Sequence, residues 1–153
     1  MAETFRCHLQ WAGATGQPLQ NAHFSRDLTA SFPNLPSMAL SAAATYKGDP
    51  NKLNPELLFV ASLSSCQALT YLFLAAQAGV GVIAYADEAE GKLGIVEGKM
   101  RMSAVTLRPL ITLAAGSDEQ KAQVLVEKAH HGCFIANSVS TMITIEPTFV
   151  ISG

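Results

Sequence analysis

Charged side chains are scarce in this chain of 153 residues. They make up 14% of it, against roughly 25% in an ordinary globular domain, while 49% is hydrophobic. A monomer of this size with so few charges would leave much apolar surface in water, so we expect an oligomer that covers part of it. The formal net charge of −2 provides no basic surface, which argues against a nucleic-acid partner.

Cysteine is also scarce, with three residues in the chain. That number does not suggest a disulfide framework, and the stretch MAETFRCHLQWAG does not have the charged start and apolar core of a secretory leader. We therefore expect free thiols in a reducing compartment, with a cytoplasmic location.

Residues 57–86 contain no charge at all. By length alone such a run could cross a membrane. However, serine, glutamine and threonine side chains form a polar patch in its middle, and two glycines interrupt its end. These features favour a helix buried on most sides inside a soluble assembly, with no membrane partner.

The order of patterns predicts an α+β fold in one domain, residues 1–153. Asn54 as N-cap, Pro55 at the first helical position and Glu56 in the first turn predict a helix that stops at Gly79. Ser117 and Gln120 form a capping box for a second helix, through His131. Strands are expected over 5–11, 21–33, 37–46, 82–96, 99–113 and 140–153, with turns around 13–18 and 47–54.

Cys66 and Cys133 are the main candidates for chemistry. Cys66 lies in the first helix beside Ser62, Ser64, Ser65 and Gln67, polar choices for an apolar helix unless that face borders a polar pocket. Cys133 follows the glycine that ends the second helix, and residues 134–137 are expected to start another turn. Exposed N–H groups at the start of such a turn can stabilise a thiolate. Either residue alone could be an ordinary buried cysteine. If the fold brings them together, the pair is a buried dithiol, which indicates thiol redox chemistry.

The remaining candidates have simpler interpretations. Cys7 is taken as a bystander. His130 and Cys133 have the spacing of two metal ligands, but Cys66 has no ligand-type neighbour, so no metal site is expected. His130 and His131 are more typical of a helix end that caps carbonyl groups.

Arg26, in HFSRDLT, is the cation chosen to support a Cys66 thiolate, although a surface pairing with Asp27 is the simpler interpretation. Glu56 shares a helix face with Cys66, yet ten residues of helix separate them by about 15 Å. We therefore expect a second subunit to supply the charged pair Arg26 and Glu56, without direct contact between Arg26 and Cys66 of one chain.

These motifs together resemble the OsmC/Ohr family of hydroperoxide reductases, and the OsmC-like branches more than the Ohr branch. The stretches that carry the resemblance are HFSRD, KGDPNKLNPELLFVASLSSCQ, YADEAEG, VTLRP and AHHGCFIANSV. Many relatives have histidine after the first cysteine, where this chain has Gln67. The resemblance implies an intertwined homodimer in which antiparallel sheets wrap around long central helices.

The resemblance also implies roles for the candidate residues. Cys66 would be the peroxidatic thiolate and Cys133 the resolving thiol, with Arg26 and Glu56 as the charged pair that tunes Cys66. An external dithiol, in the family often a lipoyl group on a carrier protein, would reduce the disulfide, and no bound cofactor is expected. An apolar lining would favour organic hydroperoxides over hydrogen peroxide by burying an alkyl tail. The residues expected to form this lining are Phe59, Leu63, Phe73, Phe134 and Ile135.

Two other functions stay open at this point. A hydrolase or transferase with a cysteine nucleophile could pair Cys66 with His130 or His131, and would need only one cysteine. A dimeric module that binds a small apolar molecule would need neither cysteine.

Overall fold

A computed structural model describes residues 2–13, 16–19 and 21–153 of the protein. They form two compact units, Met1–Leu58 and Phe59–Gly153. The single domain expected from the sequence stays a prediction. Residues 14 and 15 of the expected 13–18 turn lie outside the described residues.

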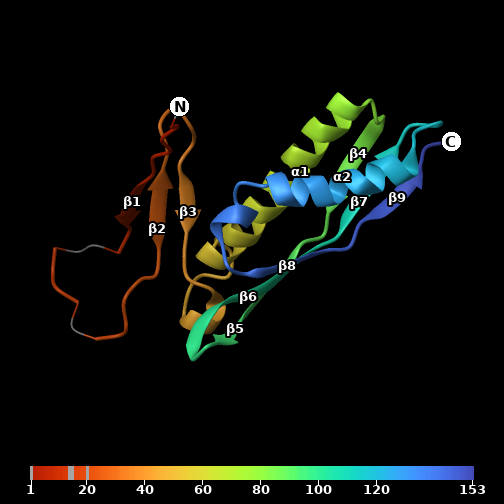
Figure 1. Ribbon diagram of the computed structural model, residues 1–153. Helices are drawn as coiled ribbons and strands as arrows, with labels where there is room; N and C mark the ends of the chain where they lie inside the picture. Colours follow the sequence, from red (N-terminus) through yellow and green to blue (C-terminus); the bar gives the residue numbers. More distant parts are fainter. Residues whose placement is uncertain (1, 14–15, 20) are drawn as a thin grey trace. The chain divides into compact units, whose positions relative to one another are not determined.

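The first unit holds a three-stranded antiparallel sheet of order β1-β2-β3 (Figure 1). Its strands are shorter than the sequence predicts. Strand β2 stops before Pro33, which lacks an N–H group for the ladder. Before Leu28, backbone N–H groups donate to nearby side chains instead of to a neighbouring strand. A short 3-10 helix follows where a strand over 37–46 is expected, so that part of the prediction is wrong. The elements are β1 His8–Trp11, β2 Leu28–Ser31, β3 Met38–Leu40 and the 3-10 helix Ala44–Tyr46.

Helix α1, Pro55–Ala78, begins and ends where the sequence predicts. The Asn54 side chain accepts a hydrogen bond from the backbone N–H of Leu57 at 2.9 Å, which satisfies one of the free donors of the first turn. Gly79 follows with φ +71°, the left-handed conformation that glycine adopts at low cost.

The second unit holds two three-stranded sheets, of order β4-β7-β9 and β5-β6-β8. Strands β4–β7 and β5–β6 pair antiparallel, whereas β6–β8 and β7–β9 pair parallel, so the expected antiparallel sheets are mixed here. The parallel pairs arise because helix α2 carries the chain across between β7 and β8. The elements are β4 Val82–Asp87, β5 Glu90–Val96, β6 Lys99–Leu107, β7 Pro109–Leu113, α2 Glu119–Gly132, the 3-10 helix Ala136–Ser138, β8 Met142–Ile145 and β9 Thr148–Ile151.

Each of the three long C-terminal strands expected from the sequence is divided in two. The Asp87 carboxylate accepts a 2.6 Å hydrogen bond from the backbone N–H of Arg108. This bond lies at the ends of strands β4 and β6. Pro147 separates β8 from β9 in the same way, because it has no N–H group to donate. The helix start also differs: Asp118, not Ser117, is the N-cap of α2, and it accepts from the backbone N–H of Lys121.

Two apolar clusters stabilise the second unit. In the first, helices α1 and α2 pack against sheet β4-β7-β9; its fully buried members include Tyr71, Ile111, Leu113, Ala122 and Ala129. The second joins the first turns of α1 to sheet β5-β6-β8 through Leu63, Val105 and Leu107.

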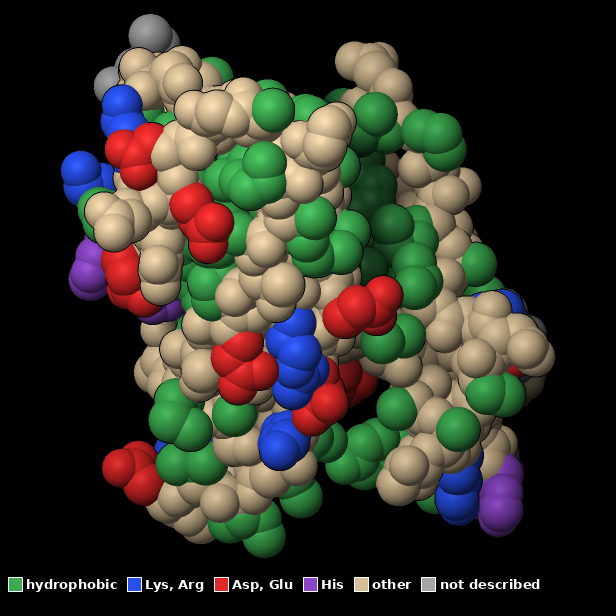
Figure 2. Space-filling view, turned by 90° about the vertical axis from the view of Figure 1, so that its right-hand side faces the viewer, with side chains coloured by type: hydrophobic (Ala, Val, Ile, Leu, Met, Phe, Trp, Pro, Cys, Tyr) green, Lys and Arg blue, Asp and Glu red, His purple; other side chains and the backbone are tan. Residues whose placement is uncertain are grey.

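Much of α1 faces outward in the single chain. It has the length and the hydropathy, 1.7, of a membrane span, but only 17% of that window is buried. This is weak evidence for a span, because core helices of soluble proteins have the same composition. Figure 2 shows hydrophobic side chains exposed among polar ones on one face of the molecule, as the low charge content predicts.

Candidate functional site

The fold of the second unit brings the side chains of Cys66 and Cys133 together. Cys66 lies in the middle of α1, and Cys133 is the residue at which α2 ends. Both are free thiols, and they lie close enough for each to shift the pKa of the other. Cys133 is 1% exposed, whereas Cys66 is partly open to solvent. A dithiol in which one sulfur is reachable and the other is covered can react with an outside molecule and then close internally.

The surroundings of Cys66 favour its thiolate. Burial alone would raise the pKa of this thiol. Hydrogen bonds from the Cys133 thiol and from the backbone N–H groups of Ile135 and Phe134 lower it, and the net direction is downward from 9.0. These donors come from the end of α2 and the segment after it, so the same turn that carries Cys133 also stabilises charge on Cys66.

Cys133 is affected in the opposite direction. Burial raises the pKa of its thiol, and the hydrogen bond with Cys66 raises it further. The backbone N–H of Ala136 donates to Cys133 Sγ at 3.4 Å and lowers the pKa in part. Cys133 therefore keeps its proton and donates it toward Cys66, so Cys66 is the sulfur of the pair that ionises first.

The lowered pKa of Cys66 predicts its reactivity with pH. We expect alkylation of Cys66 by iodoacetamide to rise with a midpoint below pH 9.0, since the thiolate is the reacting form. Mass spectrometry of a Cys7→Ser variant would follow Cys66 apart from the exposed Cys7. Cys133→Ala removes one hydrogen-bond donor and should move the midpoint to higher pH. A wild-type midpoint above 9.0 would contradict the assignment.

An apolar groove of about 450 Å³ lies between α1 and the end of α2, and its lining includes both chain neighbours of Cys133. It is lined by Leu69, Thr70, Phe73, Leu74, Lys128, Gly132 and Phe134. Of the five residues predicted to line a substrate pocket, Phe73 and Phe134 lie in this groove. Leu63 is buried in the second apolar cluster, and Phe59 and Ile135 pack against that cluster. The structure therefore divides the predicted lining between an open groove and the core.

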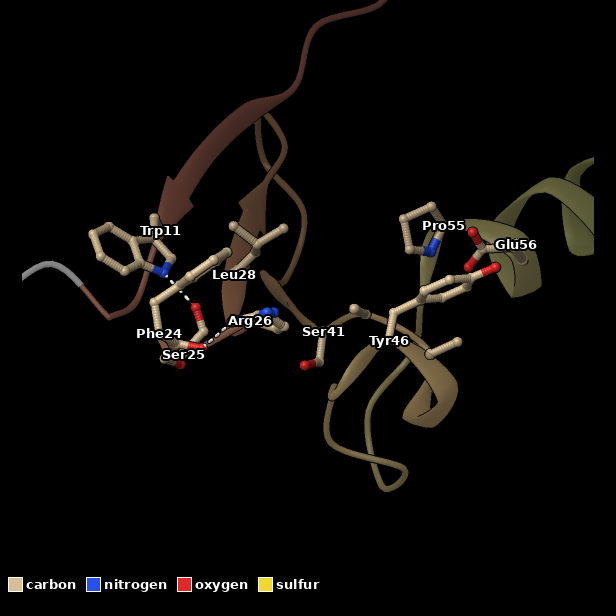
Figure 3. Close-up of a pocket in the computed structure, with 11 residues that line it drawn as sticks. Trp11, Phe24, Ser25, Arg26, Leu28, Ser41, Tyr46, Pro55 and Glu56 are labelled. Atoms are coloured by element: carbon tan, nitrogen blue, oxygen red, sulfur yellow. Dashed lines mark hydrogen bonds between the residues drawn. The ribbon is translucent and has the colours of Figure 1, made fainter. Parts of the chain in front are cut away.

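Arg26 and Glu56 line a cavity of about 290 Å³ in the first unit (Figure 3). Aromatic side chains of Trp11, Phe24 and Tyr46 form much of its wall. The Arg26 guanidinium lies 3.6 Å from the centre of the Phe24 ring and donates to the carbonyl groups of Phe24 and Ala22 at 2.5 and 3.0 Å. Within the described part of the chain, neither Arg26 nor Glu56 forms a salt bridge.

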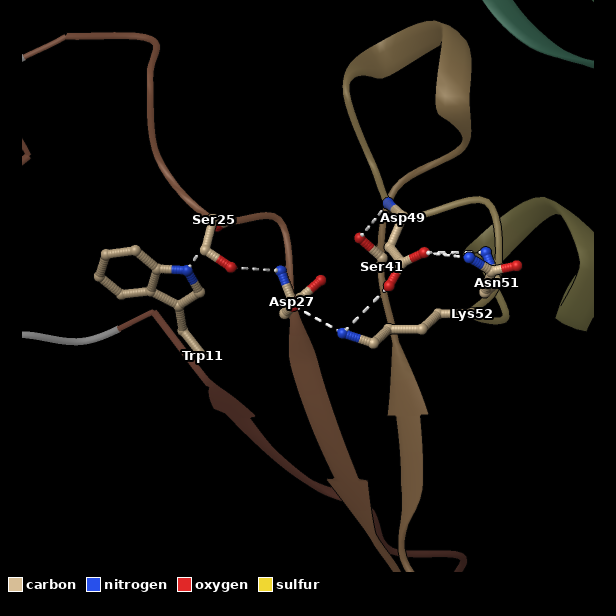
Figure 4. A network of polar contacts seen from close by, with 7 residues as sticks. All are labelled: Trp11, Ser25, Asp27, Ser41, Asp49, Asn51 and Lys52. Carbon is tan, nitrogen blue, oxygen red and sulfur yellow. Dashed lines mark hydrogen bonds and ion pairs between the residues drawn. The ribbon is translucent and has the colours of Figure 1, made fainter.

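A polar network lies beside this cavity (Figure 4). Lys52 Nζ is 2.6 Å from Asp27 Oδ2 and 3.5 Å from Asp49 Oδ2. The hydrogen bond with Asp27 raises the pKa of Lys52, and the same bond lowers the pKa of Asp27. Buried Ser41 accepts from the backbone N–H of Asp49 at 3.0 Å. Asp27 is thus bound to Lys52, so the surface pairing of Arg26 with Asp27 is wrong. Among the described residues, no carboxylate forms a salt bridge with Arg26.

The histidines do not join the dithiol. The rings of His130 and His131 lie 6.0 Å apart, and in the described ranges neither side chain is hydrogen-bonded to a cysteine. Among those residues, no group of three or more His, Cys, Asp or Glu side chains is placed to hold a metal ion.

Sequence reasoning did not identify which donors reach Cys66. The backbone N–H groups of Phe134 and Ile135 carry no residue-type signal, because any amino acid supplies them. The turn expected to start at Phe134, directly after Cys133, was the available indication of free N–H groups there.

Comparisons with known proteins agree on one family. A family model described as OsmC-like protein matches residues 48–148. The solved structure of an OsmC-like protein of unknown function from Vibrio cholerae has a TM-score of 0.88 and 30% sequence identity, covering 96% of this chain and 100% of that chain.

Two further solved structures share the fold. An organic hydroperoxide resistance protein OsmC from Legionella pneumophila has a TM-score of 0.69 at 18% identity, with 96% of each chain covered. An organic hydroperoxide resistance protein from Elizabethkingia anophelis has a TM-score of 0.70 at 19% identity, with 99% of each chain covered. Comparison with curated proteins gave no match.

Proposed function

Because the chain belongs to the OsmC/Ohr family, we propose that it is a thiol peroxidase that reduces organic hydroperoxides through Cys66 and Cys133. The observation that carries the proposal is the contact between the two thiols, with the pKa of Cys66 lowered and that of Cys133 raised. Hydrogen peroxide is a second candidate oxidant, and defence against oxidative stress in the cytoplasm is the proposed role.

The first step is attack of the Cys66 thiolate on the outer oxygen of the hydroperoxide. The O–O bond breaks, the S–O bond forms, and the alkoxide takes a proton to leave as an alcohol. Cys66 becomes a sulfenic acid, oxidised by two electrons. The backbone N–H groups of Phe134 and Ile135 support this step, since they stabilise the anion that attacks.

Cys133 then resolves the sulfenic acid. Its sulfur attacks the Cys66 sulfur, the S–O bond breaks, and water leaves with the Cys133 proton. An external dithiol reduces the resulting disulfide by thiol–disulfide exchange and is itself oxidised. We propose that a lipoyl group on a carrier protein is one such reductant, and the protein itself holds no cofactor in this scheme.

The exposed apolar surface supports a homodimer. Members of this family are typically homodimers. Leu69 and Phe73 on α1 are 69% and 61% exposed in the single chain, and neighbouring exposed apolar side chains are typical of an interaction surface. We propose that the second subunit covers this face and supplies Arg26 and Glu56, whose cavity is already assembled in the first unit.

A peroxide titration tests the function. One equivalent of tert-butyl hydroperoxide is expected to remove two thiols per chain from the Cys7→Ser variant, and tryptic mass spectrometry should find Cys66 joined to Cys133. Retention of both thiols would support a binding module instead. Turnover of an ester or thioester that survives in Cys133→Ser would support a hydrolase or transferase.

A further inference from the structure

Gln67 is a buried amide next to the reactive thiol. It is 1% exposed, and its Nε2 donates to the carbonyl oxygen of Val126 on α2 at 3.1 Å. Its Oε1 is buried without a hydrogen-bond partner among the residues that the structure describes. A buried amide with one unsatisfied atom lowers the free energy of unfolding relative to an apolar side chain of the same shape. Stability alone therefore does not explain why a glutamine occupies this position.

Tyr71, one turn further along α1, makes a second bond of the same kind. It is fully buried, and its hydroxyl donates to the carbonyl oxygen of Ala122 at 3.4 Å. The acceptors step backward along α2 by four residues while the donors step forward along α1 by four. Two bonds arranged this way resist both sliding and rotation of α2 against α1.

The apolar contacts between these helices carry no hydrogen-bond direction. Burial favours one rotational setting of α2, but it does not specify which polar groups meet, because the hydrophobic effect has no direction. The buried face of α2 consists of Ala122, Leu125, Val126 and Ala129. Between the buried faces, the directional contacts are the bonds from Gln67 and Tyr71. On the exposed surface, Lys121 Nζ of α2 also donates to the carbonyl oxygen of Ala78 of α1 at 2.5 Å.

The register of α2 sets the position of the second sulfur. Cys133 ends α2, two turns beyond Val126, and its backbone N–H still donates to the carbonyl of His130. A slip of one residue would move it by about 1.5 Å and rotate it by about 100°. A disulfide tolerates little of this, since its Cα atoms must lie roughly 4.4–6.8 Å apart.

We propose that Gln67 is a positioning residue that holds α2 in the register at which Cys133 can bond to Cys66. It touches neither the peroxide nor the reacting oxygen, and it acts on closure of the disulfide rather than on formation of the sulfenic acid. This inference deepens the proposed function, and its importance for peroxide reduction rests on that function, but the effect on the dithiol itself does not.

The test measures the dithiol equilibrium without peroxide. The full-length Cys7→Ser protein is equilibrated with mixtures of glutathione and glutathione disulfide, quenched with acid, and the fraction with a Cys66–Cys133 bond is measured by mass spectrometry. Two protein thiols lose two protons and two electrons to one glutathione disulfide, which becomes two glutathiones. Gln67→Met keeps the size of the side chain and removes the donor. We expect its equilibrium constant for closure to fall about tenfold, or roughly 30 mV.

Ile111→Val is the matched control. It removes one methyl group from the same apolar cluster and makes no bond to α2. The control should lose some stability to urea and keep its closure constant within about twofold of wild type, since burial and register are separate properties. An unchanged constant in Gln67→Met, or an equal fall in both variants, would overturn the inference.

A second variant covers failure of Gln67→Met to fold. Tyr71→Phe removes only the hydroxyl of the longer bond, and its closure constant should fall about two- to threefold; no fall would overturn the inference. A different result would contradict the proposed function alone: glutathione disulfide forms the Cys66–Cys133 disulfide in the wild-type protein, and hydroperoxide does not.

Discussion

Replacing Cys66 with serine is expected to abolish hydroperoxide reduction. At neutral pH a serine hydroxyl is almost entirely protonated, whereas the Cys66 thiol has its pKa lowered by hydrogen bonds from Cys133, Ile135 and Phe134. The rate constant for peroxide consumption should therefore fall by about a thousandfold or more, because the anion is the nucleophile. Stopped-flow measurement with tert-butyl hydroperoxide, at equal protein concentration, gives the comparison.

Cys7→Ser is the control for this substitution. Cys7 is exposed in the first unit and lies outside the dithiol, so its loss should leave peroxide consumption unchanged. The unfolding transition of Cys66→Ser should stay close to that of wild type, which separates lost chemistry from lost structure. Substantial peroxide reduction by a folded Cys66→Ser protein would remove Cys66 from the mechanism.

Replacing Cys133 with serine should limit the protein to a single turnover. Cys66 can still attack a hydroperoxide, but its sulfenic acid has no thiol beside it to form the disulfide. With a dithiol reductant that acts only on disulfides, consumption should stop after about one peroxide per chain. Excess peroxide should then convert Cys66 to the sulfinic acid, which intact-mass measurement detects as two added oxygens.

The result separates the candidate functions. Wild-type protein under the same conditions should continue to turn over and resist the second oxidation, because the buried Cys133 thiol lies within hydrogen-bond distance of Cys66. Continued dithiol-dependent turnover by Cys133→Ser, at a rate near that of wild type, would show that Cys133 is not the resolving thiol.

Signals that act within a few residues were readable from the sequence. Asn54 and Gly79 mark the two ends of α1 through local rules, an N-cap bond and a left-handed glycine, and the helix lies between them as predicted. The order of helices and strands likewise confirms the α+β class, and the family match confirms the resemblance. The expected dimer stays a prediction.

Features that depend on distant partners were not readable. The break between β6 and β7 depends on a bond between Asp87 and the backbone of Arg108, which no local pattern reveals. The sequence predicts Phe59 and Ile135 in the apolar lining of a substrate pocket, yet they pack against the core. Hydrophobicity identifies a residue that leaves water, but it does not say whether a ligand or the protein covers it.

The candidate site was partly predictable for the same reason. Cys66 and Cys133 stood out by residue type, and Arg26 and Glu56 by charge in an apolar chain. The donors that favour the Cys66 thiolate are the Cys133 thiol and the backbone N–H groups of Ile135 and Phe134, which only the folded turn brings to the sulfur.

The parallel pairing of the last strands has a consequence for biosynthesis. Ala104 pairs with Met142 and Leu110 with Thr148, so neither sheet of the second unit can be completed before residues 142–151 have left the ribosome. Contacts between segments so far apart in sequence form late. During translation Cys66 therefore leaves the ribosome well before Cys133 and the turn that covers the Cys66 thiol. In a nascent chain made under oxidant exposure, this thiol is still uncovered and has no resolving thiol beside it.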